Sequence, residues 1–187
     1  MRHCLIGIIL FATGCQTQVI AFEVDHFTDS FVPGVPELPP ELQAELPPMD
    51  ASMLQRMLAF QVGPEDLARM GVSREDVSSL RVVDLSLEVL NPEDGADLGF
   101  LSHLESWVLT EDHGDALLVS YGDFAEGMTL VDLPVDKRVN LANYAFSESF
   151  ETATFPDGEP PLVDTKIRAN ITLEVGVSLQ GIVNQVQ

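Results

Sequence analysis

Residues 167–180 read IRANITLEVGVSLQ, and this stretch decides the fold. Apolar residues occupy every odd-numbered position, while the even-numbered positions hold polar residues or glycine. A period of two is that of a β-strand with one face in a hydrophobic core and the other in water. Because the run is longer than an average strand, we expect Gly176 to mark a bulge or a bend.

The same period, together with turn signals, predicts further strands around this one. Residues 20–32 and 83–89 alternate apolar with polar side chains, and Asn91-Pro92 ends the second of these strands. Residues 104–110 and 116–121 are predicted to form a hairpin. Shorter strands are expected at 128–133, 137–141 and 144–155, the last of them ending at the turn of residues 156–161.

Two other segments have different patterns. Residues 33–48 hold half of the 12 prolines, which excludes a helix interior and a central strand. We expect a stiff, extended connector there, with a docking strip for an aromatic groove as the alternative. Residues 50–79 are predicted to be a helical insert of short pieces, because Asp50, Pro64 and Ser73 suit helix starts.

Several strands separated by turns, without a regular alternation of helices and strands, predict a mainly β protein. We expect an antiparallel β-sandwich with a short helical insert at about residues 50–79. The sandwich is expected to form a single domain over residues 15–187, including the proline-rich connector at 33–48.

The N-terminus has the three parts of a secretory signal. Arg2 and His3 form a positive region, residues 5–11 are apolar, and small residues follow. The apolar part is too short to span a bilayer. The run Ala12-Thr13-Gly14-Cys15 resembles the lipobox of bacterial lipoproteins, although alanine stands at position 12, where leucine is most frequent in that family.

This resemblance implies that residues 1–14 are removed as a signal peptide and that Cys15 is acylated. Gln16 stands where an aspartate would argue for the inner membrane, so the family rule implies the bacterial outer membrane. Several acyl chains are needed for stable anchoring, because one chain gives only marginal binding. The alternative is an ordinary secretory signal cut nearby, with Cys15 incidental. From Leu80 onwards the layout also resembles small sandwiches of exported Gram-negative lipoproteins, which implies no functional residues.

Charge and cysteine content limit the partners. Removal of residues 1–14 takes away Arg2 and no acid, which leaves eight basic and 30 acidic residues and a net charge of −22. Such a surface repels nucleic acids and anionic lipid headgroups, so we expect no nucleic-acid binding and attachment through lipid. With Cys4 in the signal and Cys15 acylated, the domain has no disulfide and no thiol nucleophile.

Acidic residues gather in the predicted hairpin turn. Glu111, Asp112 and Asp115 offer carboxylates to calcium, a hard cation that takes several oxygen ligands from a flexible loop. The turn of residues 91–97 offers similar groups. Neither turn has the ordered Asp-x-Asp-x-Asp-Gly spacing, so we expect solvated loops and no cofactor, with calcium as the alternative. The same expectation of no metal applies to the histidines, which lack zinc-site spacing: His26, His103 and His113.

No nucleophile elbow and no phosphate-binding glycine loop occurs, so we expect no catalysis. Trp107, Tyr121 and Tyr144 are candidates for a sugar-stacking platform, although the ring of Trp107 is expected in the sandwich core.

Three functions remain open. The first is a lipid-anchored envelope protein with a structural or protein-interaction role. The second is a carbohydrate- or calcium-binding sandwich, for example for envelope polysaccharide. The third is a hydrolase with an unmarked site.

Overall fold

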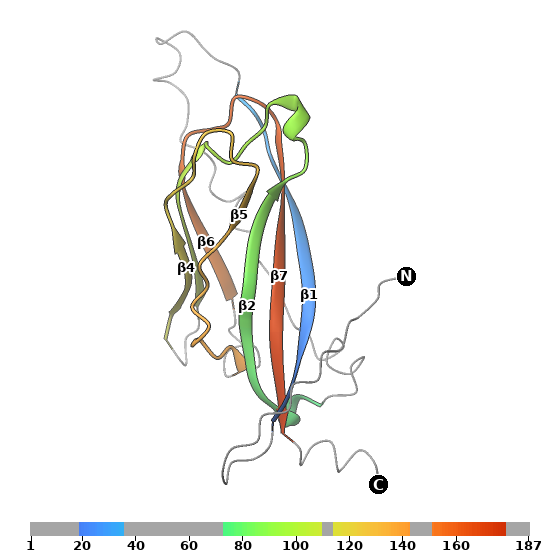
Figure 1. Ribbon diagram of the computed structural model, residues 1–187. Helices are drawn as coiled ribbons and strands as arrows, with labels where there is room; N and C mark the ends of the chain where they lie inside the picture. The colour runs from blue at the N-terminus through green and yellow to red at the C-terminus, as the bar shows by residue number, and fades with distance from the viewer. Residues whose placement is uncertain (1–18, 36–72, 110–113, 143–150, 179–187) are drawn as a thin grey trace.

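The computed structural model describes residues 19–35, 73–109, 114–142 and 151–178. Within these residues, seven strands form two antiparallel sheets that face each other (Figure 1). One sheet has four strands in the order β1-β7-β2-β5, and the other has three in the order β4-β3-β6. This arrangement confirms the predicted antiparallel β-sandwich.

The bounds of the elements follow from their backbone pairing. The four-stranded sheet contains β1 (Val19–Val32), β7 (Thr165–Ser178), β2 (Val77–Val89) and β5 (Leu130–Asp132). The three-stranded sheet contains β4 (Ala116–Tyr121), β3 (Leu101–Leu109) and β6 (Glu151–Gly158). Two single 3-10 turns flank β2, namely η1 (Arg74–Asp76) and η2 (Pro92–Asp94).

Strand β7 is the centre of the larger sheet, and it is the strand predicted from residues 167–180. It pairs with β1 along its whole length and with β2 from Ile167 to Val177. Its odd-numbered side chains from Ile167 to Val177 are at most 3% exposed. The expected irregularity at Gly176 lies in the neighbouring strand, because the register of β2 shifts between Val77 and Ser79, next to the Gly176 pair.

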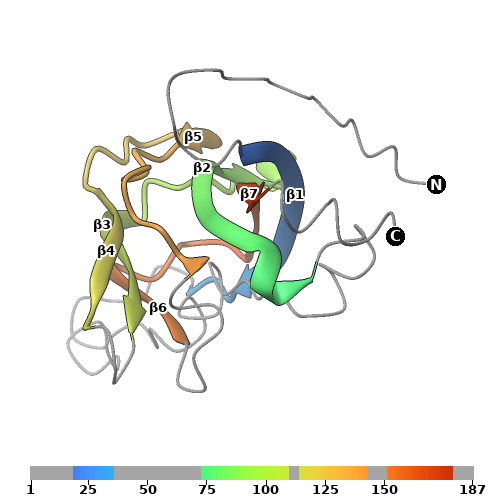
Figure 2. The same cartoon turned by 90° about the horizontal axis from the view of Figure 1, so that it is seen from below.

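The core lies between the two sheets, which Figure 2 shows as separate layers seen from below. Each fully buried leucine contributes about 1.5–3 kcal/mol relative to an exposed one. The interior therefore supplies most of the stability of a domain that holds no disulfide among its described residues. The largest buried side chains come from both sheets and their loops: Leu80, Leu87, Leu98, Leu101, Leu104, Leu141, Ile167 and Ile171.

Most of the predicted helical insert at 50–79 lies outside the described residues, which include only 73–79 of it. There, Arg74–Asp76 form one 3-10 turn, and the strand β2 begins at Val77. The predicted end at residue 79 is therefore wrong, because Val77 and Ser79 already pair with β7. Of the proline-rich connector at 33–48, residues 36–48 also lie outside the described part, and β1 ends directly before Pro33.

Three of the predicted short strands differ from the structure. Residues 137–141 are not a strand, because the chain turns there, with Val139 N–H donating to the Asp136 carbonyl (3.2 Å). The strand predicted at 128–133 is limited to Leu130–Asp132. Of the strand predicted at 144–155, residues 144–150 lie outside the described part, and β6 runs from Glu151 past Pro156 to Gly158. β6 lies at a sheet edge, which is where proline is tolerated within a strand.

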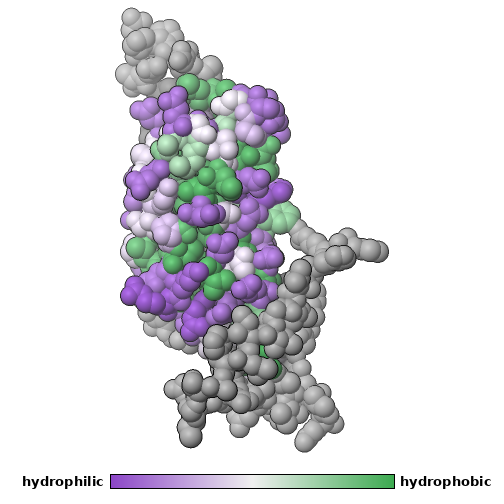
Figure 3. Space-filling view, in the orientation of Figure 1, coloured by the Kyte–Doolittle hydropathy of each residue, from purple (hydrophilic) through white to green (hydrophobic). Residues whose placement is uncertain are grey.

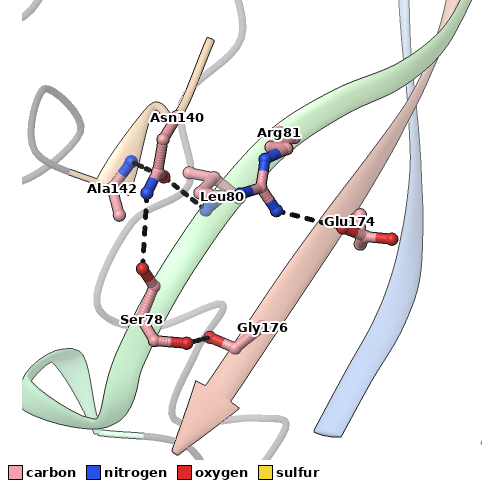
Figure 4. A network of polar contacts seen from close by, with 7 residues as sticks. All are labelled: Ser78, Leu80, Arg81, Asn140, Ala142, Glu174 and Gly176. Atoms are coloured by element: carbon pink, nitrogen blue, oxygen red, sulfur yellow. Dashed lines mark hydrogen bonds and ion pairs between the residues drawn. The ribbon is translucent and has the colours of Figure 1, made fainter. Parts of the chain in front are cut away.

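Asn140 takes the place of a strand on the free edge of β2 (Figure 4). Its Oδ1 accepts hydrogen bonds from Leu80 N–H (3.0 Å) and Ala142 N–H (3.1 Å), and its Nδ2 donates to the Ser78 carbonyl (3.3 Å). Strand β5 pairs with β2 only from Ser86 to Glu88. A side chain therefore continues the pairing where the neighbouring strand has ended.

Replacing Asn140 with alanine should lower the free energy of unfolding by about 1–3 kcal/mol, because the Leu80 N–H loses its acceptor. Asn140→Asp keeps an acceptor for both N–H groups but sets a carboxylate oxygen against the exposed Ser78 carbonyl oxygen. Because solvent screens that exposed contact, the loss of stability should be smaller than in Asn140→Ala. Urea unfolding followed by circular dichroism measures both variants. Equal stability of Asn140→Ala and the parent chain would show that the network contributes nothing.

Candidate functional site

The outer face of the three-stranded sheet carries aromatic, carboxylate and imidazole groups together. On β3, the buried Leu104, Ser106 and Val108 alternate with half-buried His103, Glu105 and Trp107. The second set therefore projects away from the core. Our expectation that Trp107 lies in the core is wrong, because from Leu104 onwards the inward positions of β3 are the even-numbered ones.

The neighbouring strands add to this face through their register. Glu105 lies opposite Ser120 of β4 and Phe155 of β6. His103 lies opposite Asp157 of β6, and Trp107 lies opposite Ala153 of the same strand. Residues directly opposite in an antiparallel pair share one face of the sheet. We call the set His103, Glu105, Trp107, Ser120, Ala153, Phe155 and Asp157 the β3 face.

Hydrogen bonds fix the centre of the β3 face. The indole Nε1–H of Trp107 donates to Glu105 Oε2 at 2.9 Å. Nε2 of His103 lies 3.5 Å from Glu105 Oε1 and 3.4 Å from Ser120 Oγ. The hydrogen bond from Trp107, followed by that of His103, holds the pKa of Glu105 below its ordinary value. This carboxyl group is consequently ionised at neutral pH and acts only as an acceptor.

Ser120, His103 and Glu105 contain the residue types of a hydrolytic triad but not its geometry. In a triad, the acid and the nucleophile contact opposite nitrogens of the imidazole ring. Here Ser120 Oγ and Glu105 Oε1 both lie at Nε2. On the other side of the ring, a Cβ atom added to Gly122 would lie 3.1 Å from Nδ1. The trio therefore suits binding and does not form the relay that activates a serine.

The aromatic platform predicted from Trp107, Tyr121 and Tyr144 is not assembled as expected. Tyr121 pairs with the inward-facing Leu104, and its ring packs edge-on against Phe124 at 4.9 Å. It thus lies on the opposite face of the sheet from Trp107. Tyr144 lies outside the described residues. The prediction missed Glu105, two residues from Trp107 on the same face of β3, and Phe155, which the register of β6 with β3 brings beside Trp107.

The predicted calcium ligands can be placed only in part. Glu111 and Asp112, like His113, lie outside the described residues, and Asp115 is exposed directly before β4. His26 lies on β1, 3.5 Å from Thr28 Oγ1. Across the described ranges, no three histidine, cysteine or acidic side chains are grouped to hold a metal ion.

The turn at residues 91–97 uses its polar groups to join loops. Asn91 Nδ2 donates to the Asp164 carbonyl, and its Oδ1 accepts from Lys166 N–H, both at 2.8 Å. Asp97 accepts from Gly99 N–H at 2.9 Å and from Gly127 N–H at 2.6 Å. These oxygens, which we considered as calcium ligands, already satisfy backbone donors.

The predicted lipidation residue Cys15 also lies outside the described part of the chain. Comparison of the sequence and the structure with protein-family models, with curated proteins and with solved structures gives no match.

The bond between Trp107 and Glu105 predicts a pH effect. The pKa of Glu105 should lie below its ordinary value of 4.5, and Trp107→Phe should raise it by removing the largest cause of the shift. Because the pKa of Glu105 is lower in the folded state, its ionised form stabilises the fold. This stabilisation is fully present above pH 4.5 and is lost as the pH falls through the lowered pKa.

Carbon-detected NMR titration of the Glu105 carboxyl group measures this pKa directly. Tyr121→Phe is the matched control, since its hydroxyl bonds to the Asp123 carbonyl (3.4 Å) on the other face. If the pKa of Glu105 were the same in Trp107→Phe and in the parent chain, the hydrogen bond from Trp107 would not be the cause of the lowered pKa.

Proposed function

We propose that the chain is a lipoprotein of the bacterial outer membrane with a structural or protein-interaction role and no catalysis. In this proposal, residues 1–14 are removed and lipid is attached to Cys15. The observation that carries the proposal is that β1 begins at Val19, four residues after Cys15. Four extended residues span at most about 14 Å, so lipid at Cys15 would hold this end of the sandwich at the membrane surface.

The strand pairing identifies which end of the sandwich would face the membrane. Val19 pairs with Ser178 and Val77 pairs with Val177, so β1 and β2 begin where β7 ends, at the bottom of Figure 1. The 14 residues of β1 extend about 45 Å. The end that carries η2 would then face away from the bilayer and be available to a partner.

Charge supports attachment through lipid. Three arginines are paired with acids: Arg168 with Asp29 at 2.7 Å, Arg81 with Glu174 at 3.4 Å, and Arg138 with Asp136 at 2.7 Å. The Arg138 guanidinium lowers the pKa of Asp136 to about 2. Basic groups that are already paired attract anionic headgroups weakly.

Exposed hydrophobic residues support a protein-interaction role. Figure 3 shows them along the middle of one face, with hydrophilic residues around them. Leu130 of β5 is 59% exposed. Apolar surface bordered by polar groups is typical of protein contacts. Among the described residues, no helix has the length and apolar character needed to cross a bilayer.

The anchor can be tested in a Gram-negative host that processes lipoproteins. Cys15→Ser should move the protein from the membrane fraction to the soluble fraction, because the acyl chains have lost their attachment atom. Cys4→Ser is the matched control and should leave the protein in the membrane fraction. Mass spectrometry of the parent protein should find a diacylated or triacylated Cys15 as the first residue. Membrane retention of Cys15→Ser, or an unmodified Cys15 in the parent, would contradict the proposal.

A further inference from the structure

We propose that the β3 face binds a neutral glycan, with Trp107 and Phe155 stacking on sugar rings and Glu105 accepting hydrogen bonds from sugar hydroxyl groups. This inference goes beyond the function proposed above. It is also independent of lipid at Cys15, because it uses only residues of the three-stranded sheet.

The polarity of β3 and β6 is inverted at neighbouring positions. The register partners Ser106 and Thr154 face the core and are 2% and 0% exposed. Their chain neighbours Trp107 and Phe155 face outward, where Phe155 is 47% exposed. A sheet normally buries its aromatic rings and exposes its hydroxyl groups. The two aromatic rings are thus not fully buried, and the stability that their burial would add is lost. In addition, the buried Thr154 Oγ1 has no hydrogen-bond partner among the described residues.

The two rings are arranged as a platform. Phe155 lies opposite Glu105 and Ala153 lies opposite Trp107, so the two rings are diagonal neighbours across β3 and β6. Diagonal neighbours in an antiparallel pair are about 7–8 Å apart. Ala153 of β6 beside Trp107 and Ser120 beside Glu105 are small, whereas Leu117 of β4 lies opposite Trp107 on its other side. The open part of the face is therefore the part between Trp107 and Phe155, on the side of β6. A flat ligand with apolar C–H faces fits such a surface.

Polar groups that are held in place lie beside the rings on β3. Glu105 is fixed by Trp107 Nε1–H and by His103, and the side chains of His103 and Glu105 are 38% and 37% exposed. Ligand sites typically combine aromatic surface with a few positioned polar groups. Groups that are already ordered lose little conformational entropy when a ligand binds. Hydroxyl donors can use the lone pairs of Glu105 that remain free.

Charge selects the ligand class. Glu105 is ionised, Asp157 lies on the same face, and the chain without residues 1–14 carries a net charge of −22, so anionic ligands are repelled. A cation binds best to a carboxylate that accepts no other hydrogen bond. Both oxygens of Glu105 already face a donor, Oε1 the Nε2 of His103 and Oε2 the Nε1–H of Trp107. A hydroxyl group needs only one remaining lone pair. These contacts favour a neutral glycan over a basic peptide.

Trp107 is the only tryptophan in the chain, so its fluorescence reports on this face alone. The full chain in mild detergent is titrated with neutral hexasaccharides of glucose, mannose and N-acetylglucosamine. The deacetylated glucosamine hexamer serves as the cationic comparison and a galacturonate hexamer as the anionic one. We expect at least one neutral hexasaccharide to give a saturable fluorescence change and the galacturonate hexamer to give none.

Three variants then locate the site by calorimetry. Trp107→Ala and Phe155→Ala should each raise the Kd at least tenfold. Phe31→Ala is the matched control, because Phe31 is 50% exposed on the other sheet, and it should leave the Kd unchanged. Circular dichroism confirms that each variant is folded. If a platform variant unfolds, protection of Trp107 from oxidation by N-bromosuccinimide in the parent chain with bound sugar provides the same test.

Any of three results would overturn the proposal. No neutral hexasaccharide binds at millimolar concentration, the cationic hexamer binds in place of the neutral ones, or Phe31→Ala weakens binding as much as Phe155→Ala does. Because detergent keeps the chain in solution whether or not Cys15 carries lipid, none of these results bears on the anchor.

Discussion

The burial of one face of β7 is the constraint on which the sandwich depends. This strand lies between β1 and β2, and its inward side chains meet the second sheet. A shift of the register by one residue would place Arg168 and Glu174 in the core, so the alternation fixes the pairing of both neighbours. The pairs of Arg168 with Asp29 and of Arg81 with Glu174 on the outer face are consistent with that register.

The sequence predicted the strands in which polarity and period agree. β1, β7 and the β3–β4 hairpin were expected within two or three residues, because their alternation is clear. The prediction failed where a side-chain contact or the position of a strand at the sheet edge outweighs the alternation of apolar and polar residues. Residues 137–141 alternate like a strand, but they form no ladder with β2: the side chain of Asn140 and one backbone hydrogen bond, from Leu141 N–H to the Leu80 carbonyl (2.6 Å), join them to β2. Pro156 was interpreted as a strand end, although at a sheet edge it is tolerated.

The β3 face shows why a site is harder to predict than a fold. The residues of β6 read as a weak strand because threonines point inward and Phe155 points outward. A strand pattern that assumes buried aromatic rings therefore places Trp107 in the core. The two strands must be aligned before the outward aromatic rings are seen to be neighbours, and single-strand periodicity does not contain that alignment. The bond from Trp107 to Glu105 follows from their spacing of two residues on one face.

The central claim is that β7 is the most stable part of the domain, and native-state hydrogen exchange tests it most directly. Amides of β7 from Ile167 to Val177 have strands on both sides, so they should exchange only when the whole domain unfolds. Amides of the edge strand β1 should exchange through local opening at a lower free energy. If β1 amides are protected as strongly as those of β7, or if β7 exchanges at the rate of β1, the account is contradicted.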